Sequence, residues 1–186
     1  KPADISDPSD EDDLPPVATE AELSQCETLR AAAHAALTSN GMEPLEDTAL
    51  PLFTREALVR YLRARKSISA STAMMVASAK WRKEYDLSQK LKEWQEDASP
   101  EAQALRASWP CGVFSVDHRG CPVYYARYGN IDLAALEKAY GFDRILKLAL
   151  TEQRQIEEGL LKASRAAGKH LVQVVCVADF DGMQWT

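Results

Sequence analysis

One apolar run near the end of the sequence constrains the fold more than any other feature. It extends from Leu171 to Ala178, is rich in β-branched residues and is interrupted only by Gln173. Such a run is typical of a strand that is buried on both faces of a sheet. A strand of this kind needs neighbours along both edges, so we expect an α/β sheet with more strands than this sequence supplies.

Upstream of that run, the hydrophobic spacing is helical as far as about residue 108. Thr19 and Glu22 form a capping-box pattern at the start of the first helical segment. The spacing predicts helices over 20–39, 55–66 behind Thr54 and 70–85 behind Ser69, one or two helical turns over 91–97, and a short helix from Pro100.

The remainder of the chain mixes strands and helices. Two β-type runs, 113–116 and 122–127, flank a turn at 117–120 and predict a β-hairpin. A short helix over 132–139 and a long helix over 142–167, closed by Gly168, precede the apolar run. The order predicts the α/β class, with an all-helical N-terminal module followed by an α/β domain.

Met74, Ala77 and Trp81 recur at helical spacing within the third predicted helix. A stripe of Met and Trp on one helix is usually part of a core. We therefore expect Trp81 to be buried between the helical module and the rest of the chain.

Negative charge is concentrated at the N-terminus. Residues 1–13 carry five of the six net negative charges, so the rest of the chain is nearly neutral. A nucleic-acid binder would show a basic excess, and its absence argues against nucleic acid as a partner. The Asp, Ser and Pro content of residues 1–18 predicts a disordered acidic tail that contributes nothing to folding, either as a solvated leader or as an interaction tail.

The sequence offers few groups for catalysis. Glycine-rich phosphate loops, a nucleophile elbow and a zinc-helix motif are absent, and the three histidines lie far apart. Asp179 and Asp181 after the apolar run are interpreted as a strand-terminating turn, with acid–base or metal-ligand roles as the alternative. We predict that the chain is not an enzyme and holds neither a metal nor another cofactor.

Cysteine spacing and hydropathy indicate the cellular compartment of the protein. The four cysteines have no CxxC spacing, which favours reduced thiols in an intracellular protein. No signal peptide or membrane-spanning run is visible in the sequence. These features predict a cytoplasmic protein.

Arg65 stands out within the second predicted helix. In projection it falls on the apolar face that contains Leu58 and Leu62, and Lys66 follows it. A buried guanidinium needs an anion, because burial without one is strongly unfavourable. The anion is either an internal carboxylate or a ligand phosphate, unless the helix ends early and Arg65 enters water.

Four blocks of the sequence resemble the CRAL-TRIO lipid-binding and lipid-transfer family, in that family's order and spacing from about residue 54 onward. Residues 58–66 together with 81–85 resemble its helical N-terminal module. Residues 117–125 resemble the hairpin that opens its lipid domain. Residues 164–168 and 179–182 resemble the end of its long helix and the D-x-x-G close of its third strand.

This resemblance implies a mixed sheet floor and a phospholipid ligand that is bound and transferred, without catalysis, at membrane surfaces. The branch it most resembles binds phosphatidylinositol, with Arg65 and Lys66 holding the inositol phosphate and Tyr124 lining the cavity. Two third-strand positions that carry hydroxyl groups in phosphatidylcholine-binding members are Val174 and Cys176 here. A choline headgroup site is therefore not expected.

The second half of the family's lipid domain has no counterpart in this sequence, which implies truncation within that domain. The implied division is a tail over 1–18, a helical module over 19–108 and the first part of the lipid domain over 109–186. We expect the isolated chain to be unable to transfer lipid, and the protein to be peripheral to membranes. The alternative is a structural or scaffold subunit that uses this body for protein contacts, with a protein partner completing the sheet.

Overall fold

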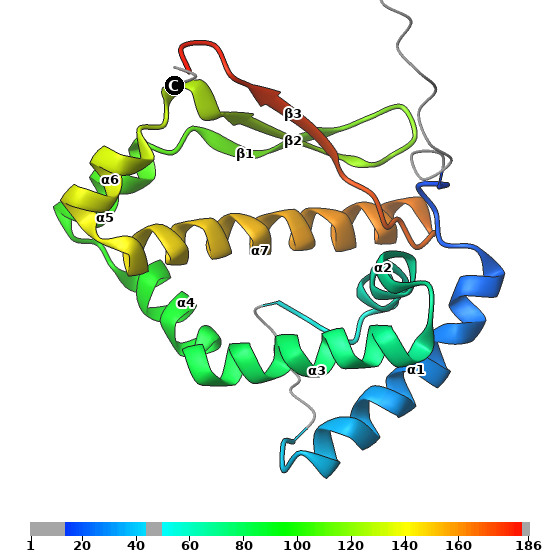
Figure 1. Ribbon diagram of the computed structural model, residues 1–186. Helices are drawn as coiled ribbons and strands as arrows, with labels where there is room; N and C mark the ends of the chain where they lie inside the picture. Colours follow the sequence, from blue (N-terminus) through cyan, green and yellow to red (C-terminus); the bar gives the residue numbers. More distant parts are fainter. Residues whose placement is uncertain (1–13, 44–49, 184–186) are drawn as a thin grey trace, which may run out of the picture.

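The fold has three layers, with one long helix in the middle (Figure 1). The computed structural model describes residues 14–43 and 50–183. The sheet forms one outer layer, α7 (Phe142–Ala167) crosses beneath it, and α1 to α3 form the opposite layer, while α4 to α6 close one end. The other described elements are α1 (Glu20–Ser39), α2 (Arg55–Arg65), α3 (Ile68–Tyr85), α4 (Leu87–Glu96), α5 (Pro100–Ala107), β1 (Cys111–Val116), β2 (Pro122–Arg127), the 3-10 turn η1 (Tyr128–Asn130), α6 (Leu133–Tyr140) and β3 (Val175–Asp179).

The sheet is mixed, with strand order β1-β2-β3. β1 pairs antiparallel with β2, and β2 pairs parallel with β3. Parallel neighbours need a crossover connection, which α6 and α7 supply. The predicted α/β class, the hairpin and the long helix are therefore confirmed.

One face of this sheet packs on α7. Pro122, Tyr124 and Ala126 alternate with more exposed residues along β2, and all three are buried. Gly159 of α7 lies so close to the sheet that a Cβ there would come within 3.3 Å of Val113. Glycine therefore allows the middle of α7 to approach β1 and β2.

Side-chain caps set the starts of the first three helices. Thr19 and Glu22 form the predicted capping box, and Thr54 caps α2. The third helix begins two residues before the predicted start, because the Ser67 hydroxyl, not that of Ser69, accepts from Ala70 N at 3.2 Å. The helical turns predicted over 91–97 belong to α4, a longer helix that already begins at Leu87.

The predicted core stripe of α3 is wrong. Met75 and Ala79 are fully buried, whereas Met74 and Trp81 are 37% and 40% exposed. α3 carries apolar residues on more than one face, and α1 and α2 pack against the face that contains Met75. Trp81 instead stacks on Tyr85, with ring centroids 5.3 Å apart.

The prediction of a strand over 171–178 that is buried on both faces is also wrong. Leu171 and Val172 are buried, but they precede the strand. Within β3, residues 176–178 are exposed. Full burial ends at Val172, before the strand begins, because no described helix covers the face of the sheet that lies away from α7 (Figure 1).

The end of the predicted acidic tail is ordered. Val17 forms an antiparallel bridge with Leu171, Ala18 N donates to His170 O at 2.8 Å, and Val172 N donates to Pro16 O at 2.8 Å. Residues 14–18 are therefore a short docked segment, because their backbone groups are paired with the segment that leads into β3. The predicted disorder of residues 1–13 lies outside the described residues.

Candidate functional site

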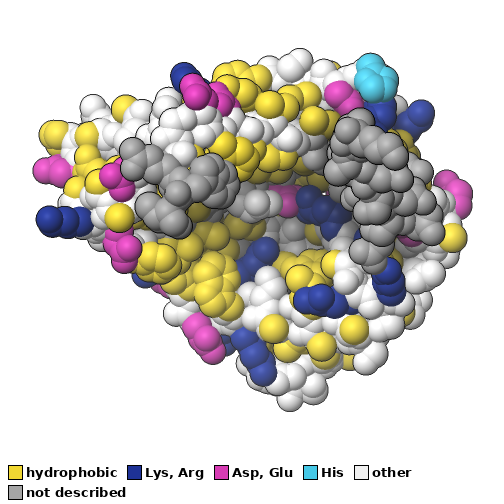
Figure 2. All heavy atoms as spheres, turned by 45° about the horizontal axis from the view of Figure 1, so that its top comes forward, with side chains coloured by type: hydrophobic (Ala, Val, Ile, Leu, Met, Phe, Trp, Pro, Cys, Tyr) yellow, Lys and Arg dark blue, Asp and Glu magenta, His cyan; other side chains and the backbone are white. Residues whose placement is uncertain are grey.

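The second face of the sheet is apolar, and no helix of the described part covers it (Figure 1). Tyr125 and Val177 lie opposite each other in the parallel register, on the face away from α7. Phe114 lies on the same face as Gly112, the strand partner of Tyr125, and its ring meets the Tyr125 ring with centroids 6.0 Å apart. Phe114 is 71% exposed and Val177 is 43% exposed. Figure 2 shows hydrophobic side chains gathered over the sheet.

We call this surface the open sheet face and define it by Phe114, Val123, Tyr125 and Val177. Exposed apolar patches on a folded chain mark places where an apolar ligand or partner binds. The strands hold these side chains in a fixed register, so the surface is preformed rather than assembled from loops.

Asp179 closes β3 at the end of the open sheet face. Its Oδ2 accepts from the Tyr125 hydroxyl at 3.1 Å, and its Oδ1 accepts from Asp181 N at 2.9 Å. The bonds from Asp181 N and Tyr125, together with Arg127 nearby, lower the pKa of the Asp179 carboxyl. With both carboxylate oxygens engaged, the observed contacts support a strand-terminating turn rather than a catalytic carboxylate.

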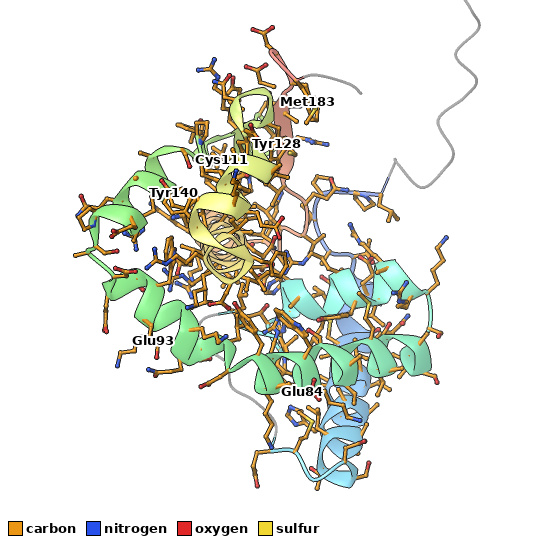
Figure 3. All side chains as sticks on the ribbon, turned by 60° about the vertical axis from the view of Figure 1, so that its left-hand side comes forward. Glu84, Glu93, Cys111, Tyr128, Tyr140 and Met183 are labelled. Atoms are coloured by element: carbon orange, nitrogen blue, oxygen red, sulfur yellow. The ribbon has the colours of Figure 1, made fainter. Side chains whose placement is uncertain are left out.

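The turn after β3 packs against η1. Gly129 allows this contact, because a Cβ there would come within 1.9 Å of Asp181 O. The rings of Tyr128 and Phe180 also approach, with centroids 5.8 Å apart. Figure 3 shows Tyr128, Cys111 and Met183 together at this end of the sheet.

The structure brings two of the sequence-predicted site residues together. Tyr124 and Cys176 are paired on adjacent strands, on the α7 side of the sheet. Tyr124 is buried under α7, and its hydroxyl has no hydrogen-bond partner among the described residues, whereas Cys176 is exposed. Val174 precedes the strand and packs with the buried cluster that contains Leu160 and Leu171.

Arg65 and Lys66 lie at the end of α2, where both are exposed. The helix ends at Arg65, and Lys66 has left-handed backbone dihedrals, with φ 55°. The helix thus ends within one residue of its predicted end, and the expected burial of Arg65 is wrong, because Arg65 is exposed in the last turn. α7 lies between α2 and the sheet, so the structure does not bring this pair to the open sheet face (Figures 1 and 3).

Two other arginines of α2 hold internal anions. Arg63 pairs with Glu22 at 2.7 Å and also donates to the carbonyl of Pro15 at 2.8 Å. Arg60 pairs with the buried Glu157 of α7 at 2.6 Å. The internally paired cations of α2 are thus Arg60 and Arg63 rather than Arg65, because the apolar spacing within a helix does not show which neighbouring element covers each face.

The residues of the open sheet face were missed by the sequence reasoning. Tyr125 and Val177 could have been found from alternation, had the strand start been known to be Val175. Phe114 follows from the same alternation, because it lies between Val113 and Ser115 on the face opposite to Val113.

The described residues contain neither a metal-binding cluster nor a membrane-spanning helix. No group of three or more His, Cys, Asp or Glu side chains is placed to hold a metal ion within residues 14–43 and 50–183. Over the same residues, no helix has the length and apolar content needed to cross a membrane.

Comparison with known proteins identifies the family. No protein-family model matches the chain. It is 33% identical over 129 residues to the SEC14 cytosolic factor of Candida glabrata, which is 68% of this chain and 41% of that protein. It is 28% identical over 130 residues to the phosphatidylinositol/phosphatidylcholine transfer protein SFH9 of Arabidopsis thaliana, which is 69% of this chain and 22% of that protein.

A third relative carries the family name itself. The chain is 28% identical over 130 residues to the CRAL-TRIO domain-containing protein T23G5.2 of Caenorhabditis elegans, which is 68% of this chain and 17% of that protein. The chain thus spans between about a fifth and two fifths of the length of the curated relatives it matches. Taken with the helical layer, the long central helix and the mixed sheet, these matches show that the chain belongs to the CRAL-TRIO family.

Proposed function

We propose that this chain takes part in the non-enzymatic binding and transfer of a phospholipid, with phosphatidylinositol as the ligand. The observation that carries the proposal is the open sheet face, an apolar surface held in register by β1, β2 and β3. The name of the Arabidopsis relative, a phosphatidylinositol/phosphatidylcholine transfer protein, supports this ligand class.

The open sheet face has the chemistry that an acyl chain needs. Phe114, Tyr125 and Val177 present rings and branched methyl groups to solvent. Each acyl CH₂ that leaves water gains about 0.8 kcal/mol, in a membrane or against a protein surface alike. Exchange between a bilayer and such a surface is therefore close to balanced, which suits a carrier that must both load and release lipid at a peripheral membrane contact.

The headgroup would be held by a separate, polar part of the molecule. Arg65 and Lys66 stay the proposed inositol-phosphate contacts, because both are exposed cations at one helix end. They lie in the α2 layer, across α7 from the sheet (Figure 1). We therefore treat acyl-chain binding and headgroup binding as two claims that need separate tests.

The proposal is tested with phosphatidylinositol that carries a pyrene-labelled acyl chain, supplied from phosphatidylcholine vesicles. Val177→Asp places a charge on the open sheet face and should reduce capture of the labelled lipid about tenfold. Met74→Asp is the matched control, because Met74 is similarly exposed but lies on α3. Equal capture by both variants would contradict the assignment of this face.

The headgroup claim has its own comparison. Arg65→Ala combined with Lys66→Ala should reduce capture of phosphatidylinositol more than capture of labelled phosphatidylcholine. Equal losses for both lipids would remove the proposed phosphate contact. If the folded wild-type chain captures neither lipid, the scaffold alternative is favoured, with a protein partner pairing with the edge of β3 that no described strand occupies.

A further inference from the structure

A second apolar surface lies in the helical layer, between α1 and α3, and α7 separates this layer from the sheet (Figure 1). It is a shallow groove of about 410 Å³ whose walls are almost entirely apolar. We call it the outer groove; its lining residues are Ala36, Asn40, Ser69, Thr72, Ala73, Val76, Ala77 and Lys80. Met74 does not belong to it, because Met74 lines the cavity between α2, α3 and α7.

The charge of the helices around the outer groove has one sign. Residues 57–83 contain seven Lys or Arg and no Asp or Glu, and residues 28–42 contain no acidic residue. All lining residues of the outer groove come from these two stretches. Because the whole chain has a net charge of −6, the positive charge here is a local feature.

The cations of residues 57–83 fall into two groups. Arg60, Arg63 and Arg82 hydrogen-bond to other parts of the chain. The other four are exposed: Arg65, Lys66, Lys80 and Lys83. Lys80 lines the outer groove, and Lys83 lies about one turn further along α3. Exposed positive charge therefore lies at both ends of α3, with the apolar groove between them.

The acidic residues that adjoin these stretches in the sequence do not line the groove. Glu27 and Glu56 have partners within the chain, Arg30 and His170. Glu43 and Glu84 follow the ends of the two stretches. Among the described residues, no carboxylate lines the outer groove beside Lys80. An anionic surface therefore complements this face, whereas an acidic residue in the groove would repel it.

We propose that the outer groove and its flanking lysines form a docking surface for an anionic bilayer. Lys80 and Lys83 would pair with the anionic groups of lipid headgroups, and the apolar walls would contact the acyl region just beneath them. The inference rests on the proposed function, in which a lipid carrier meets a membrane, and it names the face that does so. The open sheet face lies across α7, so docking leaves it uncovered (Figure 1).

The first test uses the wild-type chain and needs no variant to fold. Co-sedimentation is measured with vesicles of phosphatidylcholine alone and with vesicles of phosphatidylcholine mixed with phosphatidylserine. The chain should bind the anionic vesicles about tenfold more tightly. Added salt should remove most of this difference, because it screens exposed charges.

A charge-reversal variant then locates the surface. Lys80→Glu combined with Lys83→Glu should weaken binding to the anionic vesicles more than about twentyfold, because two attractive charges are lost and two repulsive ones are added. Lys92→Glu combined with Lys138→Glu is the matched control. It makes the same change in net charge at exposed lysines of α4 and α6, and should weaken binding far less.

The apolar walls have their own pair of variants. Ala77→Asp places a charge in the outer groove, and should weaken binding to the anionic vesicles about tenfold. Ala139→Asp adds the same charge to an exposed alanine of α6, and should have little effect.

Three results would overturn the proposal: equal binding to the two kinds of vesicle, no loss in the folded Lys80 and Lys83 variant, or an equal loss in its control. Failure of the proposed function is a separate result. Val177→Asp changes lipid capture on the open sheet face and should leave vesicle binding unchanged. A chain that binds anionic vesicles but captures no lipid would support the docking surface and contradict the lipid proposal.

Discussion

Arg60 of α2 donates to a carboxylate oxygen of Glu157 in α7 at 2.6 Å, and this bond joins the helical layer to the central helix. Glu157 is buried, and its second oxygen accepts from Gln153 at 3.3 Å. The pair lines a cavity of about 340 Å³ between α2, α3 and α7. Figure 2 shows a hollow on this side of the molecule with acidic and basic side chains inside it.

Removing Arg60 should therefore destabilise the whole chain. Arg60→Ala leaves the buried Glu157 carboxylate without its cation, and should lower the free energy of unfolding by about 2–4 kcal/mol in urea titrations. The double variant with Glu157→Gln should recover part of that loss, because the uncompensated charge is gone. No recovery would mean that the charge pairing itself contributes little.

The docked segment at residues 14–18 should contribute to stability, in contrast to the sequence expectation. Deleting residues 1–18 removes the bonds to His170 and Val172, and should lower Tm by more than about 4 °C. Deleting residues 1–13 alone is the control, and its acidic composition predicts a change below about 2 °C. Equal Tm values for the two deletions would show that the docked segment is unimportant.

The Glu22–Arg63 pair should make stability depend on acid pH. The Arg63 guanidinium lowers the pKa of the Glu22 carboxyl from 4.5 to about 2. The folded pKa lies below the unfolded one, so the stabilisation is present above pH 4.5 and is lost as pH falls toward 2. Glu22→Gln should cost about 2 kcal/mol at pH 7 and much less near pH 2, measured by urea unfolding. A cost that does not vary with pH would contradict the assigned pairing.

Gly129 should tolerate no side chain. A Cβ would meet Asp181 O at 1.9 Å, a backbone atom that cannot rotate away, so Gly129→Ala should cost about 1–3 kcal/mol and displace the turn after β3. Gly112→Ala is the matched control, because its nearest neighbour would be a Phe114 side-chain atom at 3.7 Å. The stabilities of the two variants are compared by circular dichroism melting curves.

Substitutions on α3 should follow the observed burial. Trp81→Ala should change the free energy of unfolding by less than about 1 kcal/mol, because Trp81 is 40% exposed and loses only its stacking on Tyr85. Met75→Ala should cost about 2–5 kcal/mol, because Met75 is fully buried. A larger loss of stability for Trp81→Ala than for Met75→Ala would instead support the core stripe that the sequence predicted.

The sequence by itself determined the features that depend on local chemistry. Thr19 and Thr54 cap their helices, residues 117–120 turn the hairpin, and Gly168 ends α7, because each needs only nearby backbone groups. The α/β class was also predictable, because it follows from the order in which helical and strand-type hydrophobic spacing occur along the chain. The family was predictable from four sequence blocks that match its order and spacing.

Only the tertiary structure decided which apolar and charged residues are covered. Met74 and Met75 are adjacent and equally apolar, and their burial differs because α1 and α2 pack on one side of α3. Arg63 and Arg65 are both cations on α2, but Glu22 and the docked segment reach only Arg63. Likewise, the apolar run after α7 looks uniform, yet only Leu171 and Val172 are fully buried, because no described helix covers the outer face of β3. A side chain is buried by elements that are distant in sequence, and the hydrophobic spacing within one helix or strand does not show which elements pack against it.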